Sequence, residues 1–180
     1  MTSSVDTTCT VWDIATSTPI TQLIAHDREV YDVQWSPSSK DVFASVGADG
    51  SVRMFDLRSL EHSTILYEAA PPSSTTTSPS SKSSSATASP PNPAPLLRLA
   101  FSNTSSHYMS VVHADSADVQ VLDTRSPGTP AMEVRGHKAP VNGIAWGHSA
   151  PQNGSTAGPG WLATCCASNL YPFVCCYDNV

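Results

Sequence analysis

The stretch that decides the fold runs from Phe43 to Arg58 and reads Phe-Ala-Ser-Val-Gly-Ala-Asp-Gly-Ser-Val-Arg-Met-Phe-Asp-Leu-Arg. Its two halves are rich in β-branched and aromatic residues, and the Asp49-Gly50 pair between them is typical of a tight turn. We expect strands at 42–46 and 51–57, joined by a primed turn in which Asp49 and Gly50 both adopt a positive φ. The stretch therefore predicts a β-hairpin.

The hairpin recurs along the chain. Phe55 is followed by Asp and closes the second predicted strand, and similar pairs begin at Trp12, 43 residues earlier, and at Leu122, 67 residues later. Residues 71–95 are an insertion of 25 residues, and without them the second spacing becomes 42. Both spacings match the period of about 40 to 45 residues that is typical of four-stranded propeller blades.

Two further markers repeat with the same period. One is the aromatic residue that ends the first strand of a repeat, and the other is an acidic turn residue six positions before the end of the closing strand. The aromatic residues are Trp35, Phe101 and Trp146, and the acids are Asp6 before Trp12, Asp49 before Phe55 and Asp115 before Val121. Three coincident periods indicate a true repeat.

The predicted fold class is all-β, as an incomplete β-propeller of about three and a half blades. Propellers usually need about four to eight blades to close, so we expect a fragment of a larger propeller or a truncated gene product. The predicted divisions are the end of one blade plus a complete blade (1–70), an insertion (71–95), a degenerate blade (96–134), the first half of a further blade (135–164) and an atypical Cys-rich tail (165–180).

The insertion and the tail break the pattern in different ways. The insertion contains seven Pro, nine Ser and four Thr with Lys82 as its one charge, so we expect it to be disordered. A shorter loop of the same kind is expected at 147–160. The tail has the cysteine pairs 165/166 and 175/176, and adjacent cysteines chelate one tetrahedral metal ion awkwardly. We expect no metal site there, no normal closing strand after Thr164, and a non-native origin such as an unspliced intron.

Charge and hydropathy exclude several function classes. The formal net charge of −6 leaves no basic surface for direct nucleic-acid binding. No apolar run reaches the length of about 18 residues or more that a membrane span requires, and the first ten residues lack the features of a signal peptide. We expect residence in the cytoplasm and nucleus, free thiols at the five cysteines, and no membrane partner.

Five stretches resemble the WD40 family and, within it, the Transparent-Testa-Glabra group. They are Ala25–Asp32, Phe43–Arg58, Leu60–Thr64, Leu96–Leu99 and Val141–Trp146. That group includes the plant anthocyanin-regulator WD-repeat proteins and an animal relative that associates with cullin-RING ubiquitin ligases. The resemblance covers roughly residues 4–67 and 96–164, and it implies a propeller that binds other proteins.

The resemblance also implies which residues fasten each blade. In the family a turn Asp bonds a His, the His bonds a Ser or Thr, and that hydroxyl bonds a Trp indole. The matching positions are Asp49, His26, Ser45 and Phe55 in the complete blade, Asp6 and Trp12 in the first blade, and His137 and Thr164 in the last. Phenylalanine has no N–H to donate, so the last link is missing at Phe55.

A second implied feature is a docking box. Asp56 with Arg58, and Asp123 with Arg125, resemble the Trp-Asp-x-Arg box by which many WD40 proteins dock on the adaptor subunit of cullin-RING ligases. Both copies lack the Trp. The alternative is a solvated arginine after a blade-closing Asp. The two interpretations stand level for Arg58, and the alternative leads for Arg125.

The sequence thus predicts a non-enzymatic scaffold without a catalytic or cofactor site. Its implied partners are kinases, transcription regulators or a cullin-RING ligase adaptor. A His-Ser-Asp trio also suggests a hydrolase, but the Gly-x-Ser-x-Gly nucleophile elbow is absent. Two rivals remain, an enzyme of hidden type and a gene fragment without independent function.

Overall fold

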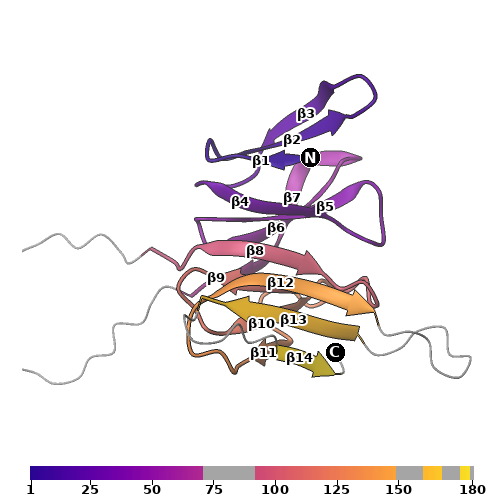
Figure 1. Ribbon diagram of the computed structural model, residues 1–180. Coiled ribbons are helices and arrows are strands. Elements are labelled where there is room, and N and C mark those ends of the chain that lie inside the picture. The colour runs from indigo at the N-terminus through magenta and orange to yellow at the C-terminus, as the bar shows by residue number, and fades with distance from the viewer. Residues whose placement is uncertain (71–91, 149–159, 168–174, 179–180) are drawn as a thin grey trace, which may run out of the picture.

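The computed structural model describes residues 1–70, 92–148, 160–167 and 175–178, and the described residues form strands without any helix (Figure 1). Most of the predicted insertion and the central part of the 147–160 loop lie outside these ranges, so the predictions for them stay predictions. No described helix is long and apolar enough to cross a membrane.

The strands form four antiparallel sheets that follow one another along the chain and stack side by side, from indigo to yellow in Figure 1. The first sheet contains β1 (Thr2–Ser3), β2 (Thr8–Asp13) and β3 (Thr18–Ile24). The second contains β4 (Val30–Trp35), β5 (Val42–Gly47), β6 (Ser51–Asp56) and β7 (Ser59–Glu68). The third contains β8 (Leu96–Phe101), β9 (Tyr108–His113), β10 (Val119–Asp123) and β11 (Met132–Val134). The fourth contains β12 (Val141–His148), β13 (Gly160–Cys166) and β14 (Cys175–Asp178). This arrangement is consistent with part of a β-propeller.

The central hairpin forms where the sequence predicts it, but its turn differs from the prediction. Val46 pairs with Val52, and the backbone N–H of Gly50 donates to the carbonyl of Gly47 at 3.1 Å. Gly50 alone has a positive φ, of 74°, whereas Asp49 does not. The loop is therefore a three-residue turn with glycine in the left-handed region. Asp49 keeps ordinary backbone angles, and its side chain accepts the N–H of Ser51 at 3.0 Å.

The third sheet corrects one of the predicted periods. Phe43 pairs with Phe55 in the second sheet, and Met109 pairs with Leu122 in the third, so Leu122 and not Val121 occupies the closing position. The turn acid Asp115 then lies seven residues before this position because the connection between the paired residues Val112 and Val119 is one residue longer than that between Val46 and Val52. Asp115, with a φ of 58°, takes the left-handed conformation that Gly50 takes in the second sheet.

The prediction that the pattern ends after Thr164 is wrong. Strand β13 continues to Cys166, and residues 175–178 form β14, which pairs antiparallel with β13. Leu162 pairs with Tyr177, as Phe43 pairs with Phe55, so the tail supplies the closing strand of the fourth sheet. This strand was not predicted from the sequence because no Asp-Gly turn precedes it and no Trp-Asp pair closes it.

The hydrophobic core lies between neighbouring sheets. Phe101 packs against Ala44 and its neighbours in the second sheet, and Trp146 packs against the third sheet. The indole N–H of Trp146 donates to the carbonyl of Ala100 and to Ser110 Oγ, both at 3.0 Å. Trp35, at the equivalent place in β4, is 37% exposed and meets Phe43 of its own sheet edge to face, whereas Trp146 is only 8% exposed. Two of the three predicted aromatic markers, Phe101 and Trp146, are thus contacts between neighbouring sheets.

Candidate functional site

The first candidate cluster is the polar network of the second sheet. His26 Nδ1 lies 3.0 Å from Asp49 Oδ1, and His26 Nε2 lies 2.8 Å from Ser45 Oγ. Because a carboxylate only accepts hydrogen bonds, Nδ1 carries the proton and donates it, and Nε2 accepts from the Ser45 hydroxyl. The structure therefore brings together the three residues that the sequence singles out here.

Asp49 is the centre of this network. Its carboxylate also accepts from Ser51 Oγ at 2.8 Å and from Arg53 Nη2 at 3.2 Å, and Arg53 in turn donates to Asp27 at 2.6 Å. Burial raises the pKa of Asp49, but hydrogen bonds from His26 and Ser51 outweigh it and hold the pKa well below its usual range. The network thus contains an ionised carboxylate near neutral pH.

The geometry of this trio favours a structural role. Ser45 is fully buried and His26 is 1% exposed, so a substrate atom has no path to the serine oxygen. The ring of Phe55 stacks on Phe43 with centroids 5.2 Å apart, and no indole is present to continue the chain. The cluster ties β5 and β6 to the loop before β4 and offers no reactive group to solvent.

The first sheet contains the link that the second lacks. The Trp12 indole N–H donates to Thr2 Oγ1 at 3.0 Å, across β1 and β2. Asp6 is bonded to no histidine in the part of the chain that the structure describes and instead accepts from the Thr8 hydroxyl at 2.6 Å. This hydrogen bond, together with one to Ser4, lowers the pKa of Asp6. Thr2 was not found from the sequence because it precedes the first recognised strand.

The fourth sheet contains a partial network. His137 Nε2 lies 2.6 Å from Thr164 Oγ1, so the structure brings these two predicted residues together. His137 Nδ1 is buried and has no hydrogen-bond partner among the described residues. This half of the network matches the His26–Ser45 contact of the second sheet.

The second candidate cluster comprises two corners with the same sequence pattern. After β6, Arg58 donates from Nε to Asp56 Oδ1 at 2.9 Å and from Nη2 to Oδ2 at 2.5 Å. Hydrogen bonds from the Arg58 side chain and backbone lower the pKa of Asp56 to about 2. The Arg58 side chain is nevertheless 69% exposed. Each corner therefore presents an ion pair rather than a bare cation.

The corner after β10 repeats this geometry. Arg125 donates to both oxygens of Asp123, at 2.9 and 2.7 Å, and lowers the pKa of Asp123 to about 2. The Arg125 guanidinium also lies 5.9 Å from the centre of the Tyr108 ring. Asp56 and Asp123 occupy equivalent register positions, so the two arginines lie at the same end of neighbouring sheets.

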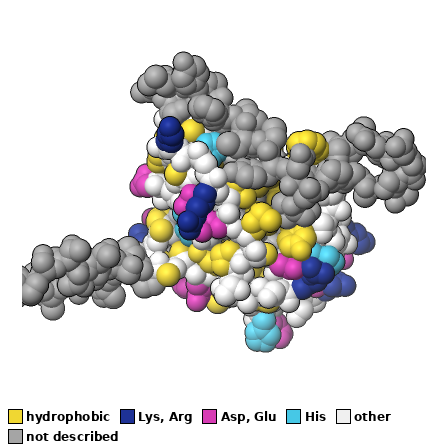
Figure 2. Space-filling view, turned by 90° about the horizontal axis from the view of Figure 1, so that it is seen from below, with side chains coloured by type: hydrophobic (Ala, Val, Ile, Leu, Met, Phe, Trp, Pro, Cys, Tyr) yellow, Lys and Arg dark blue, Asp and Glu magenta, His cyan; other side chains and the backbone are white. Residues whose placement is uncertain are grey.

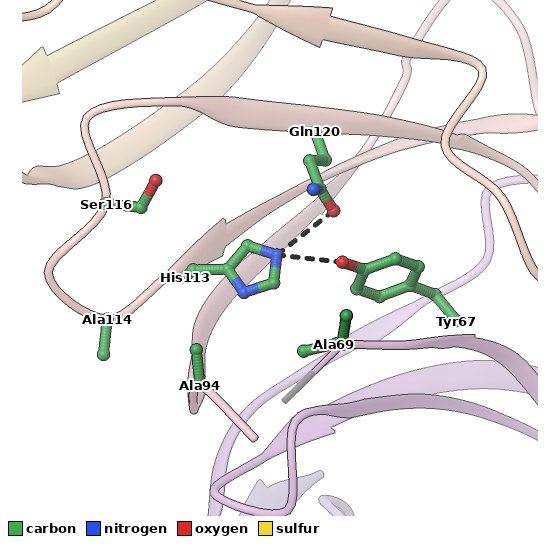
Figure 3. A pocket seen from close by; sticks show the side chains of 8 residues that line it. Tyr67, Ala69, Ala94, His113, Ala114, Ser116 and Gln120 are labelled. Carbon is green, nitrogen blue, oxygen red and sulfur yellow. Dashed lines mark hydrogen bonds between the residues drawn. The ribbon is translucent and has the colours of Figure 1, made fainter. Parts of the chain in front are cut away.

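A third cluster was missed by the sequence. His113 Nε2 lies 3.1 Å from Gln120 Oε1 and 3.4 Å from Tyr67 Oη, and all three residues line a pocket of about 320 Å³ (Figure 3). The Tyr67 and His113 rings meet edge to face at 5.7 Å. Tyr67 lies in the second sheet and His113 and Gln120 lie in the third, so no spacing within one repeat connects Tyr67 with the other two. No group of His, Cys, Asp and Glu in the described ranges has the arrangement of a metal site.

The fourth sheet has an apolar surface groove. Gly143, Ala145, Ala163 and Cys165 line it, together with Ile144 and Thr164. The molecule seen from below, from the side of the fourth sheet, shows hydrophobic side chains in several places, with charged side chains in small groups of mixed sign (Figure 2). No broad basic patch is visible on this face.

Comparison with known proteins identifies the repeat. Residues 17–56 match the WD40 family model described as WD domain, G-beta repeat. These residues include β4, β5 and β6, the strands around the central hairpin.

Similar proteins cover most of the chain. An uncharacterized WD repeat-containing protein of Schizosaccharomyces pombe is 53% identical over 144 residues, which are 80% of this chain and 32% of that protein. The DDB1- and CUL4-associated factor 7 homolog of Dictyostelium discoideum is 48% identical over 145 residues, 81% of this chain and 38% of that protein. A WD repeat-containing protein of Saccharomyces cerevisiae is 47% identical over 152 residues, 84% of this chain and 28% of that protein. The chain spans about a third of the length of these relatives.

Proposed function

We propose that this chain, which is a WD40-repeat protein, acts as a non-enzymatic scaffold that brings other proteins together. The observation that carries the proposal is the pair of equivalent Asp-x-Arg corners at Arg58 and Arg125. Both arginines are exposed, and both are oriented by the preceding carboxylate. The strands and the preceding carboxylates already hold these two side chains in place, so they lose little conformational entropy when a partner binds.

The finer proposal is docking on a cullin-RING ubiquitin ligase adaptor. One relative is described as a DDB1- and CUL4-associated factor 7 homolog, and the sequence around the central hairpin resembles the Transparent-Testa-Glabra group. Arg58 uses two of its five N–H groups on Asp56, so the remaining N–H groups are available to a partner carboxylate or carbonyl.

Kinases and transcription regulators are the other proposed partners, and the proposed residence is the cytoplasm and the nucleus. Support for both comes from the resemblance to the Transparent-Testa-Glabra group. The absence of a broad basic patch on the face in Figure 2 favours protein partners over direct nucleic-acid binding. Imaging of a fluorescent fusion of the intact protein tests the location, and exclusion from both compartments would contradict it.

The decisive experiment is co-precipitation of the intact protein with the ligase adaptor DDB1. Arg58→Ala should reduce the amount of adaptor recovered about tenfold, because the variant loses one or two charge-assisted hydrogen bonds to the adaptor. Because Arg58 is exposed, the variant should unfold at the same temperature as the natural protein.

The matched control is Arg28→Ala. Arg28 is also exposed, but it lies at the opposite end of the hairpin beside His26 and should not affect recovery. Unchanged recovery with Arg58→Ala and Arg125→Ala together would rule out this docking role.

A further inference from the structure

The pocket between the second and third sheets occupies a place that an imidazole ring fills elsewhere in the molecule. In the loop before β4, the N–H of Ala25 donates to the carbonyl of Thr7, and in the loop before β8, the N–H of Ala69 donates to Gly50. Thr7 and Gly50 each follow the turn acid of their hairpin. Residue 70 therefore corresponds to residue 26, and His26 is replaced there by Ala70.

A second exchange accompanies the first. Gly47 ends β5, and a Cβ at this position would lie 2.9 Å from His26 Cγ. The equivalent residue at the end of β9 is His113, since Val46 pairs with Val52 and Val112 with Val119. With alanine at position 70, the strand end has room for a large side chain, and His113 enters from the strand side.

His113 fills only part of the space. The remaining pocket of about 320 Å³ has alanine side chains on its walls, from Ala69, Ala70, Ala94 and Ala114. Tyr67, Ser116 and Gln120 provide hydroxyl and amide groups, and no lysine, arginine, aspartate or glutamate of the described ranges lines it. Such a lining disfavours a charged ligand, whose desolvation nothing would offset.

The second ring nitrogen of His113, Nδ1, determines which hydrogen-bonding group a ligand of the pocket must carry. Nε2 donates to the amide oxygen of Gln120, which leaves Nδ1 as an acceptor. In Figure 3 the Nδ1 edge of the ring turns away from Gln120, toward Ala69 and Ala94. Nδ1 has no hydrogen-bond partner among the residues that the structure describes, so an N–H donor in the pocket could pair with it.

We propose that this pocket binds the neutral imidazole side chain of a histidine in a protein partner. Imidazole is flat enough to lie between alanine methyl groups, and it offers one donor for His113 Nδ1 and one acceptor for a hydroxyl. The same ring at the equivalent place in the second sheet, His26, also combines a donor and an acceptor contact. This assignment rests on the proposed scaffold function, because it names one side chain that a partner would insert.

The test uses small probes on the intact protein. N-acetylhistidine methylamide is titrated at a pH about two units above the usual histidine pKa of about 6.5, so that its ring is neutral. Ring resonances of His113 and Tyr67 are followed by NMR and assigned with His113→Gln. We expect saturable shifts at both rings with the histidine probe. N-acetylphenylalanine methylamide should bind about tenfold more weakly because it lacks the hydrogen bonds.

Matched variants locate the binding. Ala70 is exposed, so Ala70→His should fold normally and place a ring of the chain itself in the pocket, which abolishes the saturable shifts. Ala15→His adds the same ring in an exposed turn and should leave binding unchanged. Absence of saturable shifts, equal binding of the phenylalanine probe, or unchanged binding in Ala70→His would each overturn the proposal. None of these results depends on the adaptor co-precipitation, so the two proposals fail separately.

Discussion

The second and third sheets have equivalent backbones but different side chains at one pair of equivalent positions. In the second sheet, His26 enters from the loop and meets a buried serine and an ionised Asp49. In the third, Ala70 stands at that loop position, and His113 enters from the strand end instead. The His26 arrangement fills the space beside the strand end, whereas the His113 arrangement leaves a pocket. Fastening a blade and opening a site are thus alternative uses of one position.

The largest expected effect on stability comes from removing His26 from the network of the second sheet. His26→Ala would leave Asp49 and Ser45 without their shared partner in a buried place, which should lower the free energy of unfolding by roughly 3 kcal/mol. Urea denaturation of the intact protein measures it. The equivalent His113→Ala should cost clearly less, since its partners Tyr67 and Gln120 face the pocket. Equal costs would show that the two sheets do not differ as described.

The carboxylate of Asp49 makes the stability of the second-sheet network depend on pH. The folded-state pKa of Asp49 lies below its unfolded value of about 4, so its contribution to stability is fully present above about pH 4. That contribution is lost as the pH falls through the folded-state pKa. We expect Asp49→Asn to lose stability at neutral pH by about 2 kcal/mol and to flatten the decline in acid. An unchanged acid limb would exclude Asp49 as a source of the decline.

The exchange at the strand end can be tested directly. In Gly47→Ala, the new Cβ would lie 2.9 Å from Glu29 O and from His26 Cγ, which should cost about 1–3 kcal/mol through overpacking. The double variant with His26→Ala should cost less than the sum of the two single variants, because the clash with the ring disappears. Strict additivity, measured by urea denaturation, would contradict the link between positions 26 and 47.

Local patterns predicted the fold better than they predicted the site. The hairpin and the period could be found because each lies within a repeat and has a fixed spacing, and the His26–Asp49 pair could be found because its residues match a motif of the WD40 family. The third-sheet pocket could not, since Tyr67 and His113 meet across two sheets and share no sequence pattern. The closing strand at 175–178 was missed for a related reason, because its pairing with β13 depends on backbone register rather than on a turn or Trp-Asp motif.

The smallest expected effect compares the turns of the first two hairpins. Thr7 follows Asp6 as Gly50 follows Asp49, and both adopt a φ of 74°. This left-handed conformation is unfavourable for a β-branched residue and costs glycine nothing. Thr7→Gly should therefore raise the midpoint of urea denaturation, equivalent to about 1 kcal/mol. The matched change Gly50→Ala should lower it, since a Cβ would also lie 2.9 Å from Pro93 Cβ. A loss of stability in Thr7→Gly would mean that the contacts of the threonine side chain outweigh its backbone strain.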